Sequence, residues 1–114
     1  IGAGNVGGSV PYNPLTGNIS NLRVVVGTAV YTSSFTPSTT PLTAISGTAL
    51  LTCQSNRFID NSANNLSITV NGTPTIQKFS PFSTTIVPKY YSTSFNGSSD
   101  YLSVTYNSSF AFVK

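Results

Sequence analysis

Apolar residues in this chain alternate with polar ones in short runs, and Gly, Pro or Asn interrupts each run. The clearest runs are residues 22–26, 66–70 and 101–106. A period of two places successive side chains on opposite faces of a β-strand, and no segment repeats its apolar residues with helical spacing. The sequence therefore predicts an all-β fold, an antiparallel β-sandwich or jelly roll with little or no helix.

Asn-Gly pairs mark the places where this strand pattern turns most tightly. Both residue types accept the positive φ angles that a two-residue hairpin turn requires. We therefore expect a strand over residues 66–70 to pair, across Asn71-Gly72, with a return strand over residues 75–79. A second Asn-Gly pair at residues 96–97 separates two further predicted strands.

The inventory of reactive side chains argues against an enzyme. Only 6% of the residues are charged, His is absent, and the acidic residues are Asp60 and Asp100 alone. Glycoside hydrolysis needs two facing carboxylates, whereas these two lie in separate predicted turns. The single thiol, Cys53, lies in the apolar run 49–54, which predicts a small buried side chain rather than a nucleophile.

The net charge of +3 reflects a shortage of acids rather than a basic patch. The basic residues are scattered along the chain: Arg23, Arg57, Lys78, Lys89 and Lys114. Binding to successive phosphates requires clustered cations, so we expect no nucleic-acid partner. No apolar run approaches the roughly 20 residues that cross a bilayer, so we expect no membrane insertion.

Residues 2–7 match the G-x-G-x-x-G dinucleotide-binding pattern. That pattern works only when a helix follows it, and Gly8, Pro11 and Pro14 prevent one. The acidic residue expected about 20 positions later is also missing, because Asp60 is the first acid. We expect a loop or an edge segment, and no cofactor site, here.

One candidate metal site is the polar run that begins at Asp60. Asp60, Asn61 and Asn64 offer the clustered oxygen atoms that calcium prefers. A single carboxylate is a thin charge complement for Ca²⁺, and such residues commonly form hydrogen-bonded turns. The structural turn is therefore the favoured interpretation, with calcium as the alternative.

A candidate glycan contact lies near the second Asn-Gly pair. Tyr90, Tyr91 and Tyr101 supply aromatic faces for sugar rings, and Asn96 and Asp100 supply groups for hydroxyls. Alternating aromatic residues also pack within cores and across strands. Core packing is therefore the favoured interpretation for these tyrosines, with the glycan contact as the alternative.

Two parts of the sequence resemble a known family. Residues 17–37, GNISNLRVVVGTAVYTSSFTP, resemble the last strand and exit of laminin-G-like, concanavalin-A-like jelly-roll domains. These domains occur in fibre and virion structural proteins of tailed bacteriophages, particularly marine and cyanobacterial ones. Residues 49–82, together with 95–104 (FNGSSDYLSV), resemble the opening strands of the next such domain.

The order of these matches implies an unusual domain organisation. Residues 1–32 would be the C-terminal strands of one jelly-roll unit, residues 33–48 a Ser/Thr/Pro linker, and residues 49–114 the N-terminal strands of the next unit. The chain is then either a fragment across a repeat boundary, which Ile1 in place of Met also suggests, or a permuted unit that folds as one small sandwich.

The resemblance implies a non-enzymatic structural β-sandwich of a phage virion fibre or appendage, located on the virion or outside the cell. Its expected partners are further copies of the chain or other fibre subunits, which would complete the sheet edges, and host-surface glycans. The alternative is a carbohydrate-binding adhesin module of a bacterial surface or extracellular filament.

Overall fold

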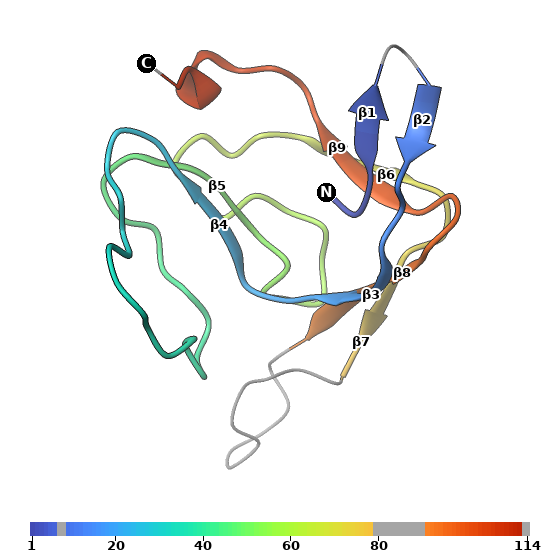
Figure 1. Cartoon of the computed structure of the whole chain (residues 1–114), viewed down its shortest axis with the longest axis horizontal. Helices are drawn as coiled ribbons and strands as arrows, with labels where there is room; N and C mark the ends of the chain where they lie inside the picture. Colours follow the sequence, from blue (N-terminus) through green and yellow to red (C-terminus); the bar gives the residue numbers. More distant parts are fainter. Residues whose placement is uncertain (7–8, 79–90, 113–114) are drawn as a thin grey trace.

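The computed structural model describes residues 1–6, 9–78 and 91–112, and within them the chain is built from short β-strands (Figure 1). Every strand pairing is antiparallel, which confirms the predicted all-β fold. No membrane-crossing helix occurs among the described residues. The elements are β1 (Gly4–Val6), β2 (Ser9–Tyr12), β3 (Thr16–Ile19), β4 (Leu22–Val25), β5 (Thr48–Thr52), β6 (Ile68–Asn71), β7 (Thr75–Gln77), β8 (Ser92–Asn96), β9 (Tyr101–Val104) and the 3-10 helix η1 (Ser108–Phe110).

The sheets join strands that lie far apart in the sequence. One sheet has the order β3-β8-β7, and three two-stranded sheets pair β4 with β5, β6 with β9, and β1 with β2. The register joins Ile19 of β3 to Thr93 of β8 and Leu22 of β4 to Thr52 of β5. Strands of the first predicted segment, residues 1–32, therefore share their sheets with strands of the third.

The predicted hairpin at Asn71-Gly72 is wrong. β6 pairs with β9, so that Asn71 lies opposite Tyr101, whereas β7 pairs with β8. Gly72 has the expected positive φ of 73°, and Gly97 has a φ of 72°. The positive φ therefore serves a bend at which the chain leaves one sheet and enters another. Gly72 lies at the bend between β6 and β7, and Gly97 lies at the bend between β8 and β9. Part of the expected return strand, at Phe79, lies outside the described residues.

Asp100 holds this bend, which we call the glycine corner (residues 71–73 and 96–100). Its carboxylate accepts hydrogen bonds from Thr73 N (2.6 Å) and Asn96 N (3.2 Å), and only 2% of the residue is exposed. The approach leaves no room for a side chain, because a Cβ on Gly72 would lie 2.4 Å from Asp100 Oδ1. Both the carboxylate and the glycine are therefore required by the crossing of the chain between sheets.

The core lies against β8, β9 and β5. Phe95, Leu102 and Cys53 form one buried cluster, so Cys53 is the small buried residue that the sequence predicts. β5 is buried along its whole length. It is covered on one edge by β4 and on the other by a loop, in which Asn61 N donates to Leu51 O at 2.7 Å. This loop contains the predicted calcium residues.

Candidate functional site

Asp60 is a buried structural acceptor. Only 4% of the residue is exposed. Its Oδ1 accepts hydrogen bonds from Leu51 N (3.0 Å) and Ser62 N (2.8 Å), and its Oδ2 from Ser62 Oγ (2.8 Å) and Leu66 N (2.9 Å). Burial raises the pKa of this carboxyl, but the hydrogen bonds outweigh burial and hold the pKa below its ordinary value.

The side-chain amides of Asn61 and Asn64 donate hydrogen bonds to other residues of the chain. Asn61 Nδ2 donates to Gln54 Oε1 (3.3 Å), and Asn64 Nδ2 donates to Ala49 O (2.9 Å). The donors around Asp60 use the carboxylate lone pairs that a calcium ion would need. In the part of the chain that the structure describes, no group of three or more His, Cys, Asp or Glu side chains could hold a metal ion. The geometry is that of a turn that fastens the loop to β5.

The polar residues of the predicted glycan contact belong to the glycine corner. Asn96 Oδ1 accepts hydrogen bonds from Ser98 N (2.8 Å), Ser99 N (3.0 Å) and Asp100 N (3.3 Å). Asp100 is itself buried and bonded to backbone amides. These oxygen atoms stabilise the corner, so their hydrogen-bonding capacity is directed into the fold.

The two tyrosines of that predicted contact that the structure describes, Tyr91 and Tyr101, lie at the starts of strands in different sheets. Tyr91 directly precedes β8, and its carbonyl oxygen accepts a hydrogen bond from Ser20 Oγ at 3.2 Å. Tyr101 begins β9 at the glycine corner and lines a small apolar cavity of about 320 Å³ with Leu50 and Phe110. Tyr90 lies outside the described residues.

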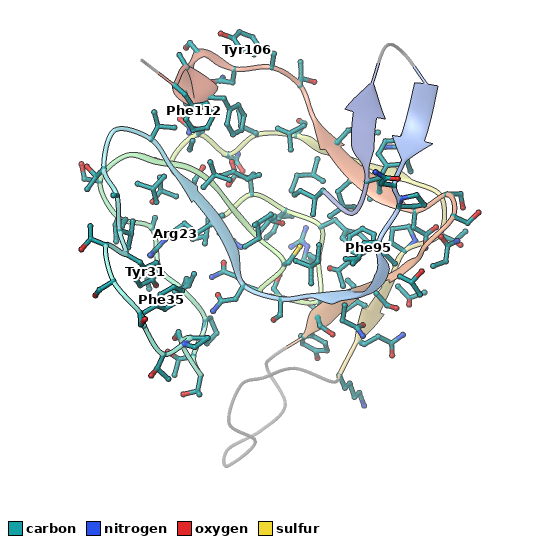
Figure 2. All side chains as sticks on the ribbon, in the orientation of Figure 1. Arg23, Tyr31, Phe35, Phe95, Tyr106 and Phe112 are labelled. Carbon is teal, nitrogen blue, oxygen red and sulfur yellow. The ribbon has the colours of Figure 1, made fainter. Side chains whose placement is uncertain are left out.

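A larger groove lies between β4 and the segment of residues 26–42. Its volume is about 450 Å³. We call it the β4 groove, and the residues that carry its chemistry are Leu22, Arg23, Val30, Tyr31, Phe35 and Leu42. Figure 2 shows Arg23, Tyr31 and Phe35 close together at one side of the molecule. None of the three is among the predicted site residues.

Two aromatic rings form an exposed stack in this groove. The ring centroids of Tyr31 and Phe35 are 3.8 Å apart, and the ring planes differ by 9°. Tyr31 is 50% exposed and Phe35 is 55% exposed. Each ring therefore covers one face of the other while a large part of both stays accessible. Clustered, exposed aromatic side chains are unusual enough on a folded surface to indicate a binding function.

Polar side chains at β4 hold the returning chain in place. Arg23 Nη1 donates to Thr43 O at 2.8 Å, and Asn21 Nδ2 donates to Thr40 O at 3.1 Å. Asn21 Oδ1 also accepts a hydrogen bond from Leu42 N at 2.7 Å. These contacts span about 20 residues of sequence, and they fasten the end of the returning segment to β4.

The charge of Arg23 meets no side-chain carboxylate. The two acids of the chain, Asp60 and Asp100, are buried elsewhere and bonded to backbone amides. The bond to Thr43 occupies one of the five N–H donors of a guanidinium. The β4 groove therefore combines an accessible aromatic surface with an unopposed positive charge.

The amino-acid composition of this part of the chain does not indicate a binding site. Residues 33–48 are rich in Ser, Thr and Pro, which favours a linker. The available signal was the presence of two aromatic residues, Tyr31 and Phe35, four positions apart in an otherwise polar segment.

Comparison of the chain with protein-family models, with curated proteins and with solved structures found no match.

Proposed function

We propose that the protein is a non-enzymatic structural β-sandwich module of a bacteriophage fibre or other virion appendage. The module assembles with neighbouring subunits and contacts host-surface glycans through the β4 groove. Support comes from the resemblance of residues 17–37, 49–82 and 95–104 to jelly-roll repeats of phage structural proteins, and from the low-charge, hydroxyl-rich composition of an all-β chain.

The exposed Tyr31–Phe35 stack beside Arg23 is the observation that carries the glycan contact. Aromatic faces pack against the C–H groups of sugar rings, and a guanidinium donates hydrogen bonds in a fixed planar pattern. A small number of polar groups around an apolar surface is typical of small-ligand sites. The predicted glycan function is therefore assigned to this groove rather than to the tyrosines near the glycine corner.

The burial and hydrogen bonding of the two acidic residues support a non-enzymatic role. Asp60 and Asp100 are both buried, and each accepts hydrogen bonds from backbone amides. Hydrolysis of a glycoside requires a pair of carboxyl groups that face the substrate. Neither acid lines the β4 groove.

Edge strands support the proposed assembly. β3 and β7 are the outer strands of their sheet, and β6 pairs only with β9 among the described residues. Val70 of β6 is also exposed. Unpaired edges with apolar side chains favour strand addition by a neighbouring chain. Light scattering after size-exclusion chromatography should give an oligomer mass, and a dilute monomer would contradict the assembly.

A glycan array probed with the whole chain tests the ligand-binding part of the proposal. We expect signals that disappear when Phe35→Ser removes the exposed ring, and a blank array would leave the structural role alone. Gold-labelled antibodies and electron microscopy of the source particles should place the protein on a phage appendage. Label on a bacterial surface filament would instead favour the adhesin alternative, which the same groove supports.

A further inference from the structure

We propose that the ligand of the β4 groove is a saccharide that carries a carboxylate, such as a uronic acid at the end of a glycan. In this proposal Arg23 binds the carboxylate, and the Tyr31–Phe35 stack packs against the sugar ring. The inference rests on the proposed glycan contact and names its ligand class.

The charge distribution of the groove selects an anion. Arg23 is the charged residue that lines it. Both acids of the chain are buried in other parts of the fold, so no side-chain carboxylate competes for the guanidinium. The planar guanidinium and a carboxylate form paired, charge-assisted hydrogen bonds, which are stronger than hydrogen bonds between neutral groups. A neutral sugar would leave this feature unused.

The guanidinium is already positioned before a ligand arrives. Nη1 of Arg23 donates to Thr43 O at 2.8 Å, which fixes one side of the planar group against the returning segment. A fixed donor loses less conformational entropy on binding than a mobile surface arginine. The contact with Thr43 also ties the cation to the segment that carries the aromatic stack.

The aromatic stack selects a ring with an apolar face. Tyr31 and Phe35 are parallel to within 9° and about half exposed. The groove volume of about 450 Å³ lies within the roughly 300–1,000 Å³ of small-ligand sites. A polyanion with successive phosphates would require several cations, and Arg57 and Lys78 do not line the groove. Carboxylate and sugar ring together match both halves of the site.

Two disaccharides that differ at one carbon test the proposal. The first contains glucuronic acid, and the second contains glucose, in which a hydroxymethyl group replaces the carboxylate. Each is titrated into the isotope-labelled whole chain and followed by NMR. We expect chemical-shift changes centred on residues 20–43, with an affinity at least tenfold higher for the acidic sugar.

Arg23→Gln is the test variant, because it removes the charge and keeps a polar side chain at this position of β4. We expect it to bind the acidic sugar no more tightly than the neutral one. Arg57→Gln is the matched control, since this exposed arginine lies outside the groove, and its affinities should equal those of the wild type. Backbone spectra and thermal melting show whether each variant keeps the fold.

The outcomes separate this inference from the proposed function. Equal affinity for the two sugars would overturn the acidic-ligand inference and leave the glycan contact standing. Preference for the acidic sugar that survives Arg23→Gln would overturn the assignment to the groove. Absence of binding to both sugars, together with a blank glycan array, would overturn the glycan contact as well.

Discussion

Replacement of Asp60 by Asn should destabilise the protein substantially, although it removes only one charge. The wild-type carboxylate accepts four hydrogen bonds, two on each oxygen. An Asn side chain keeps one acceptor oxygen and presents an NH₂ group to the other two donors. Ser62 Oγ can rotate and accept from this NH₂ group, but Leu66 N–H is left without an acceptor. Net contributions of about 1.5–3 kcal/mol for a hydrogen bond to a charged group give an expected loss of about 2–3 kcal/mol.

The pH dependence of this loss provides a stricter test. The pKa of Asp60 lies below its ordinary value in the folded protein, and an unfolded Asp has a pKa of about 3.9. A depressed folded pKa stabilises the protein fully above about pH 5, and the stabilisation is lost as the pH falls through the folded pKa. The difference in free energy of unfolding between wild type and Asp60→Asn should therefore shrink as the pH decreases.

Urea unfolding of both proteins at pH 7 and along a series toward pH 2 measures this difference. Asn64→Ala is the control in the same loop, because it removes one neutral hydrogen bond to Ala49 O and should cost about 1 kcal/mol at every pH. A loss below about 0.5 kcal/mol for Asp60→Asn at pH 7, or a difference that stays constant with pH, would refute the role assigned to the carboxylate.

The remaining predictions concern the glycine corner, the buried thiol and the exposed stack. Gly72→Ala should cost about 2 kcal/mol or more, because its Cβ would collide with Asp100 at a positive φ; Gly27→Ala, with a φ of 87° and open space around it, isolates the backbone cost of about 1 kcal/mol, and equal losses in chemical denaturation would contradict the steric argument. Cys53 is buried, and burial raises the pKa of its thiol, so a thiol reagent should modify the native chain far more slowly than the urea-unfolded chain. Equal modification rates would show that the thiol is accessible. Phe35→Ser should change the free energy of unfolding by less than about 1 kcal/mol, because the ring is more than half exposed, and a larger loss would make the stack a structural element.

Local patterns in the sequence predict local conformation well in this protein. The alternation over residues 22–26 and 101–106 corresponds to β4 and β9. The Asn-Gly pair at residues 71–72 also has the positive φ that its composition predicts. What the pair cannot predict is the partner of each flanking strand, because the paired residues lie 15 to 36 positions away in the sequence.

The candidate site depends on the same kind of distant contact. Tyr31 and Phe35 lie in a segment whose composition is typical of a linker, and nothing local indicates that it packs against β4. Its position depends on hydrogen bonds that join Asn21 and Arg23 to residues 40–43. In the two predicted polar clusters, Asp60 and Asp100 are buried acceptors for backbone amides.

The glycine corner also has a mechanical consequence. Two antiparallel stretches of chain bend there together, so the β6–β9 and β7–β8 pairings are continuous through the covalent backbone on both sides of the bend. A force applied to either pair of strands is transmitted to the other pair through two covalent connections, one between β6 and β7 and one between β8 and β9. We therefore expect the two sheets to resist peeling together, a property that would suit the fibre subunit proposed above.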